Sequence, residues 1–159
     1  GASCVSFAEQ VADSFADKLF YTNHKFGFRN ALLPNFDVEY LVEGEGIVMK
    51  RRTEGEYLYK NQMEKKEYEV EIGVKAFANT LEYSDLAAMV SGEYSGYSLQ
   101  FSGNGVYVDE NDGDQSIRHY FLMSENGDYI YEAYLKIPSF FYSRHVQGFE
   151  DFTKTMEVF

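Results

Sequence analysis

The sequence predicts an α+β fold in which helices flank an antiparallel β-sheet, and three patterns support this prediction. Apolar and charged residues alternate from Tyr68 to Ala76, as in a strand with one buried face. Asn126-Gly127 separates two alternating segments, 117–124 and 128–137, and this dipeptide favours the two-residue turn of a β-hairpin. Near both ends of the chain, apolar residues recur at the three- or four-residue intervals of an amphipathic helix.

The two terminal helices are predicted from this spacing. The first covers residues 6–19, where every fourth residue is apolar: Phe7, Val11, Phe15 and Leu19. The second begins at Ser143, and its apolar positions are Val146, Phe149, Phe152 and Met156. Both helices are therefore expected to pack one face against the sheet.

Further elements are expected between the two helices. Two strands, 25–33 and 36–42, flank the corner at Pro34, and residues 47–52 return antiparallel after a glycine-containing turn at 43–46. Residues 53–66 are charged and weakly periodic, which predicts an exposed excursion. The remaining expected elements are a short helix from an N-cap at Ser84 to Val90 and a strand near residues 97–101.

The length and composition predict one domain, residues 1–159, with an aromatic core. The chain has 159 residues, of which 45% are hydrophobic, and it contains 14 Phe and 14 Tyr but no Trp. A chain of this size buries about 70% of its unfolded surface, so it needs no disulfide or metal to stabilise a core. No repeat, linker or low-complexity segment divides the sequence.

The charge balance disfavours two classes of partner. Asp and Glu number 26 against 14 Lys and Arg, which gives a net charge of −12. Such a chain repels the nucleic-acid backbone and anionic membrane surfaces. No apolar window is long enough for a transmembrane helix. With nucleic acid and membranes disfavoured, a protein is the expected partner.

The single cysteine, Cys4, leaves three readings of the first residues open. One cysteine excludes an intramolecular disulfide and a multi-cysteine zinc site. The start Gly1-Ala2-Ser3-Cys4 lacks Met, which suggests a removed leader. Cys4 is then either a lipidated anchor after a lipobox or a residue left by an ordinary signal peptide, and both predict a periplasmic or secreted location. The alternative is a trimmed cytoplasmic chain with an idle or buried thiol.

Three local patterns resemble the PsbP-like family of extracytoplasmic accessory proteins. They are Tyr21-Thr-Asn23 through Phe26-Gly-Phe28 to Leu33-Pro34, the turn Gly44-Glu-Gly46-Ile-Val, and the hairpin followed by a helix near the end. The resemblance covers most of residues 20–159. It implies an α/β/α sandwich around an antiparallel sheet and a role in binding or assembly, whereas no binding residue of the family can be transferred. The resemblance does not explain the excess of acidic residues or the exposed excursion at 53–66.

An acidic segment is the candidate metal site. Its oxygen-bearing side chains, which suit Ca²⁺, are Asp109, Asn111, Asp112 and Asp114. The spacing does not match an EF-hand, because Gly113 falls at the fifth position and Tyr120 at the twelfth. An acidic turn between two strands explains the same residues without a metal.

No catalytic motif is present. The three histidines, His24, His119 and His145, have no metal-ligand spacing, and His119 alternates with apolar residues as expected of a histidine on a sheet face. The sequence also lacks a nucleophile elbow and a phosphate-binding loop.

The expected function is therefore an exported, non-enzymatic binding or assembly module with no cofactor. Segment 94–114 is the expected partner surface, with Tyr94, Tyr97 and Tyr107 as the binding aromatics. A calcium-binding domain is the second hypothesis. An enzyme of unrecognised type is the third, and it requires a deep pocket that brings His119 together with carboxylates.

Overall fold

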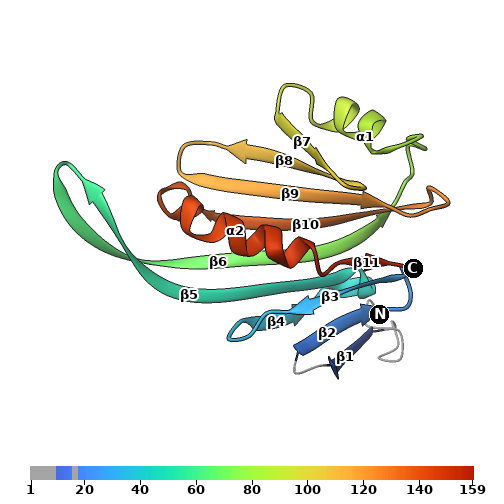
Figure 1. The fold of residues 1–159 in the computed structure, drawn as a ribbon, viewed down its shortest axis with the longest axis horizontal. Coiled ribbons are helices and arrows are strands. Elements are labelled where there is room, and N and C mark those ends of the chain that lie inside the picture. Colours follow the sequence, from blue (N-terminus) through green and yellow to red (C-terminus); the bar gives the residue numbers. More distant parts are fainter. Residues whose placement is uncertain (1–9, 16–17) are drawn as a thin grey trace.

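The computed structural model describes residues 10–15 and 18–159, which form two antiparallel sheets (Figure 1). The larger sheet contains β4 (Asp37–Tyr40), β5 (Gly46–Tyr59), β6 (Gln62–Ala78), β7 (Ser98–Ser102), β8 (Gly105–Asn111), β9 (Gln115–Met123) and β10 (Tyr129–Pro138). Its strand order is β4-β5-β6-β10-β9-β8-β7. The smaller sheet, in the order β1-β2-β3-β11, contains β1 (Gln10–Phe15), β2 (Lys18–Asn23), β3 (Phe28–Leu32) and β11 (Glu157–Val158).

The predicted α+β fold, a sheet flanked by helices in an α/β/α sandwich, is wrong because the described chain is mostly β. It contains two α-helices, α1 (Leu86–Glu93) and α2 (Tyr142–Thr153), and 3₁₀ turns at Val42–Gly44 and Ser139–Phe141. Helix α2 packs on one face of the larger sheet, whereas α1 covers only one end of the other face. Most strands are joined by tight hairpins, so little of the chain remains for helices.

The predicted N-terminal helix, 6–19, is also wrong where the structure describes it. Residues Gln10–Phe15 form β1, which pairs antiparallel with β2 from Gln10↔Asn23 to Phe15↔Lys18. Residues 6–9 and 16–17 of this prediction, and Cys4, lie outside the described residues. A spacing of four is also a multiple of the two-residue period of a strand, so the same apolar pattern fits either structure.

The patterns of the central and C-terminal strands are confirmed. All five apolar residues of the alternating segment in β6 are buried: Tyr68, Val70, Ile72, Val74 and Ala76. The Asn126-Gly127 turn joins β9 to β10 in the register Ile130↔Met123, and Gly127 has φ 79°. Helix α2 begins next to the predicted Ser143, whereas α1 is capped by Asp85 rather than by Ser84. Strand β8 precedes the acidic turn, where the sequence predicts a strand without giving its bounds.

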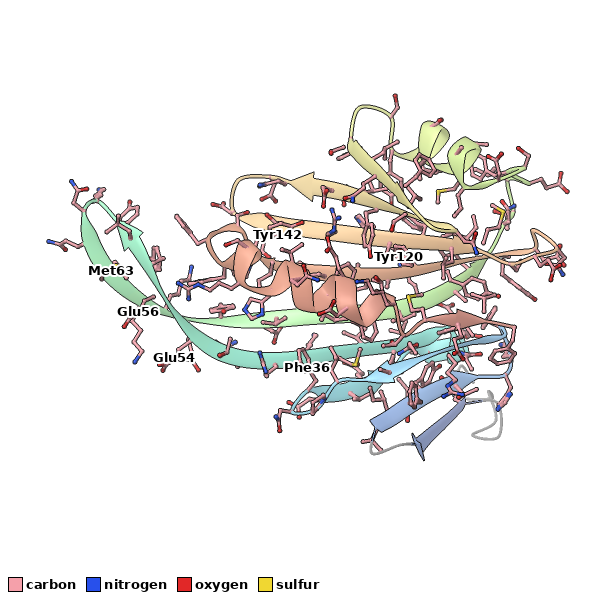
Figure 2. The ribbon with its side chains drawn as sticks, viewed as in Figure 1. Phe36, Glu54, Glu56, Met63, Tyr120 and Tyr142 are labelled. Atoms are coloured by element: carbon pink, nitrogen blue, oxygen red, sulfur yellow. The ribbon has the colours of Figure 1, made fainter. Side chains whose placement is uncertain are left out.

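The exposed excursion at 53–66 is the distal part of the β5–β6 hairpin. It pairs in register from Thr53↔Tyr68 to Tyr59↔Gln62 and turns at Lys60-Asn61, which have φ values of 51° and 64°. This arm extends past the other strands, and Figure 2 labels Glu54, Glu56 and Met63 along it. The prediction that this segment is exposed is confirmed.

Candidate binding cleft

An open cleft of about 1160 Å³ lies at one end of the larger sheet. Three turns surround it: β2–β3 (24–27), β7–β8 (102–104) and β9–β10 (124–126). The end of α2 and strand β11 form its remaining wall. The hairpins therefore bring together four segments that are far apart in the sequence.

Aromatic and aliphatic side chains line the cleft. Tyr120 and Leu122 come from β9, and Tyr129 and Tyr131 come from the adjoining part of β10. Alternate residues of a strand point to the same face, so these four side chains share the face on which α2 packs. Figure 2 shows Tyr120 on β9 near the last turns of α2.

Neighbouring groups fix the orientation of the tyrosines. The hydroxyl of Tyr131 donates to the carbonyl of Phe26 at 2.6 Å, and burial raises the pKa of this tyrosine. The ring of Tyr120 lies against Gly105, where a Cβ atom would approach the ring to 2.3 Å. Phe26 packs edge-on against Tyr129, with the ring centroids 5.3 Å apart. The apolar surface is thus preformed.

The rim of the cleft carries more positive than negative side chains. Lys25 and Lys154 line it, whereas Glu125 is the one acidic residue among the lining residues that the structure describes; Lys154 also lies 3.7 Å from Asp151 of α2. Lys25 donates to the carbonyl of Glu43 at 3.1 Å, and its Nζ lies 5.4 Å from the centre of the Phe26 ring. In a chain with a net charge of −12, this excess favours a ligand that carries an anionic group.

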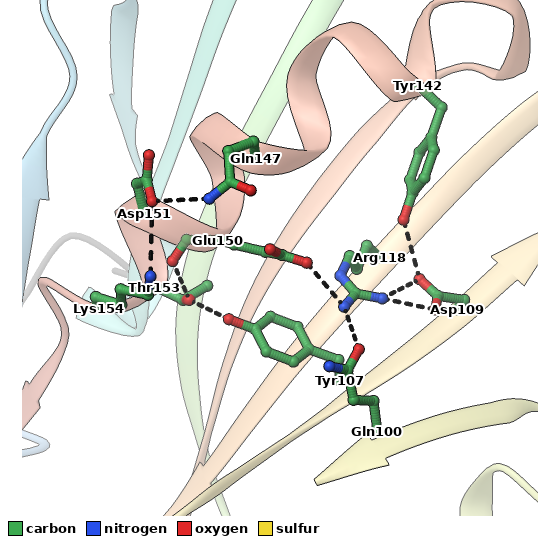
Figure 3. Close-up of polar contacts among 10 residues, drawn as sticks. All are labelled: Gln100, Tyr107, Asp109, Arg118, Tyr142, Gln147, Glu150, Asp151, Thr153 and Lys154. Carbon is green, nitrogen blue, oxygen red and sulfur yellow. Dashed lines mark hydrogen bonds and ion pairs between the residues drawn. The ribbon is translucent and has the colours of Figure 1, made fainter. Parts of the chain in front are cut away.

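A buried arginine network holds α2 beside the cleft (Figure 3). The Nη1 of Arg118 donates to both carboxylate oxygens of Asp109, at 2.8 and 2.6 Å. Its Nη2 donates to Gln100 at 2.9 Å and to Glu150 of α2 at 3.0 Å. The guanidinium also lies 4.2 Å from the centre of the Tyr107 ring. One side chain therefore ties three strands to the helix.

The four residues of the calcium hypothesis do not converge on one point. Asp109 belongs to the Arg118 network and also accepts from the hydroxyl of Tyr142 at 3.2 Å. Asn111 accepts from the N–H of Gly113, and Asp112 accepts from the N–H groups of Asp114 and Gln115. The backbone bonds lower the pKa of Asp112.

Within the part of the chain that the structure describes, no group of three or more His, Cys, Asp or Glu residues is placed to hold a metal ion. The side chains of Asn111 and Asp112 stabilise the β8–β9 turn instead, whereas Asp109 lies in β8 and Asp114 in the turn itself. Calcium binding stays a prediction.

His119 lies on the other face of the larger sheet, away from the cleft. Its Nδ1 is 2.5 Å from Glu132 and its Nε2 is 2.6 Å from Glu110, so both ring nitrogens have carboxylate partners. Tyr94 packs over the ring at 5.4 Å, and Lys75 lies 3.8 Å from Glu132. The structure thus brings His119 together with two carboxylates in a buried cluster, in which His119 is only 8% exposed.

This arrangement predicts a pH-dependent stability. Burial opposes the charge of His119, but the bonds to Glu132 and Glu110 outweigh it and raise the pKa. The charged histidine therefore stabilises the fold fully below about pH 6.5, and this contribution is lost as the pH rises through the folded-state pKa. We expect His119→Gln to lower the free energy of unfolding more at about pH 6 than at about pH 9. Urea unfolding of both proteins measures the difference, and an equal loss at both pH values contradicts the prediction.

The three predicted partner-binding tyrosines do not form one surface. Tyr107 is buried and its hydroxyl lies 2.6 Å from that of Thr153, on the face under α2. Tyr94 packs near His119 on the opposite face, and Tyr97 is 45% exposed beside it. The residues of β9 and β10 that line the cleft are instead predicted from the sequence only as strand positions. The Tyr-rich alternation around Asn126-Gly127 is the sequence signal that points to them.

The sequence matches no model of a known protein family, and no curated protein matches it. The resemblance to the PsbP-like family therefore stays a prediction. None of the described helices has the length and apolar character needed to cross a membrane.

Proposed function

We propose that this protein is a non-enzymatic binding module that holds an extended segment of a partner protein in the cleft. The observation that carries the proposal is the cleft of about 1160 Å³, whose apolar floor is preformed and whose rim carries Lys25 and Lys154. Preformed concave sites with an apolar lining and a few polar groups are typical of ligand binding. The proposal does not depend on export or on a lipid at Cys4.

The chemistry of the cleft defines the segment that it would bind. Tyr120, Tyr129 and Phe26 present ring faces and edges, which suit aromatic or aliphatic side chains. Lys25 and Lys154 are exposed on the rim, where they would contact a carboxylate of the bound segment. The expected ligand is thus an apolar sequence beside Asp or Glu. Rigid aromatic walls lower the entropy cost of binding, because few side chains must be ordered.

An anionic aromatic dye tests the cleft directly. We expect anilinonaphthalene sulfonate to bind the folded protein with saturable fluorescence, since it combines fused rings with one negative charge. The double variant Lys25→Glu/Lys154→Glu should weaken this binding about tenfold, because it reverses both rim charges. Lys66→Glu/Lys136→Glu is the matched control: it changes the net charge equally, and both lysines are exposed outside the cleft. Equal affinities of the two double variants contradict the site.

A peptide library tests the class of partner. We expect selection on the folded protein to enrich peptides that combine aromatic or aliphatic residues with Asp or Glu. The enriched peptides should lose affinity for Lys25→Glu/Lys154→Glu and keep it for Lys66→Glu/Lys136→Glu. Peptides that bind both double variants equally well would remove the proposal that the cleft recognises a protein segment.

A further inference from the structure

Strand β7 is an unprotected edge of the larger sheet. It pairs with β8 alone among the described strands, and all five of its residues are exposed. Every second residue of such a strand directs its N–H and C=O groups away from the sheet. Leu99 is 39% exposed and Phe101 is 59% exposed, so apolar side chains accompany the free backbone groups.

The composition of β7 lacks the devices that usually prevent edge-to-edge pairing. Proteins protect edge strands with charged residues, proline or bulges, whereas β7 has the sequence Ser-Leu-Gln-Phe-Ser and pairs with β8 without a bulge. It lies within 94–108, the longest stretch of the chain without a charged residue. Because the protein has a net charge of −12, this stretch is where a second copy meets the least repulsion.

The strand is chemically symmetric about Gln100. If two copies of β7 pair antiparallel about this residue, Leu99 lies opposite Phe101 of the second copy, and Ser98 lies opposite Ser102. The two-fold axis repeats each contact, so apolar side chains meet apolar ones and hydroxyls meet hydroxyls. Aromatic–aliphatic cross-strand pairs of this kind stabilise antiparallel sheets.

The strand at the opposite edge of the sheet, β4, carries charged residues. Strand β4 is also exposed, but its four residues include Asp37 and Glu39. Pairing two copies of β4 brings like charges together, which disfavours that contact. One edge therefore accepts a second copy and the other does not, so association closes at two copies instead of growing into a chain.

We infer that this protein forms a symmetric dimer in which β7 of each copy pairs antiparallel across Gln100 and the two larger sheets become continuous. The inference does not rest on the proposed function of the cleft. The partner is a second copy of this chain, recognised by uncharged backbone pairing and by the Leu99–Phe101 contacts.

Sedimentation equilibrium over a wide range of protein concentration tests the dimer. We expect a monomer–dimer equilibrium that strengthens as NaCl is added, because salt screens the repulsion between two acidic copies. Leu99→Lys should weaken the dimer about tenfold. Val38→Lys is the matched control, since Val38 is also 39% exposed and lies on β4. Thermal unfolding of both variants verifies that they fold. A monomer under all conditions, or equal weakening by both variants, overturns the inference.

Disulfide trapping tests the register. In a Cys4→Ser background, Gln100→Cys places its thiol opposite its own copy at the two-fold axis, with cross-strand Cβ atoms about 4.5–5.5 Å apart, so mild oxidation should link the dimer. Ser98→Cys lies opposite Ser102 and should remain largely unlinked. Linkage through Ser98→Cys but not through Gln100→Cys would overturn the proposed pairing.

Discussion

Arg118→Ala is expected to lower the free energy of unfolding by about 3–5 kcal/mol, one of the two largest losses that we predict for this protein. The side chain is 6% exposed and pairs with Asp109 and Glu150 at 2.6 and 3.0 Å. Its removal leaves Asp109 of β8 and Glu150 of α2 without their shared counter-ion. It also removes the stacking contact with Tyr107. Helix α2 should therefore loosen from the sheet.

Urea unfolding measures this loss, and an exposed arginine of the same sheet provides the control. Arg52 is 61% exposed in its side chain and lies 3.7 Å from Glu67. Because exposed ion pairs contribute little, Arg52→Ala should cost less than about 1 kcal/mol. Arg118→Lys should lie between wild type and Arg118→Ala, since lysine keeps the charge but cannot reproduce the forked contacts. A loss below about 1 kcal/mol for Arg118→Ala would show that the network does not hold the helix.

Phe141→Ala is expected to have a similar effect, about 3–5 kcal/mol, through loss of packing. The Phe141 ring is fully buried and stacks on Tyr68 with a centroid distance of 4.0 Å. It also fills the space over Gly55, where a Cβ atom would lie 2.6 Å from the ring. Alanine would leave a cavity between α2 and the β5–β6 hairpin, which the rigid strands cannot close.

The neighbouring phenylalanine is a matched control for this prediction. Phe140 is 60% exposed and contacts Tyr57 of the β5–β6 arm, with centroids 4.8 Å apart. Phe140→Ala should therefore cost less than about 1 kcal/mol. Thermal unfolding should separate the two variants by several degrees. Equal losses for both substitutions would contradict the packing that the structure shows at the start of α2.

Local sequence patterns predicted the structure correctly wherever it depends only on residues close together in the sequence. Asn126-Gly127 tolerates the backbone of a tight turn, so the hairpin of β9 and β10 follows from two residues. Alternation in β6 follows from one buried face, and the apolar spacing after Ser143 predicts the face of α2 that buries Phe149 and Phe152. His119 is also a buried histidine on a sheet face, as its apolar neighbours predict.

The helix-flanked architecture was predicted wrongly because spacing is ambiguous near the N-terminus. An interval of four suits a helix face and a strand face alike, and only pairing with β2 makes 10–15 a strand. Intrinsic helix and strand propensities have little influence on the structure of such segments, because hydrogen bonds from a neighbouring strand outweigh them. The fold class therefore depended on contacts that a local pattern does not contain.

The sequence by itself determined the acidic surface, the aromatic core, the central hairpin and the C-terminal helix, since each depends on composition or on neighbouring residues. Only the tertiary structure decided the cleft, the Arg118 network and the free edge at β7. Lys25 and Lys154 are 129 positions apart, yet both line the cleft because the β2–β3 turn and the end of α2 meet at the same place. Strand order and register set such distances, and they arise from long-range pairing.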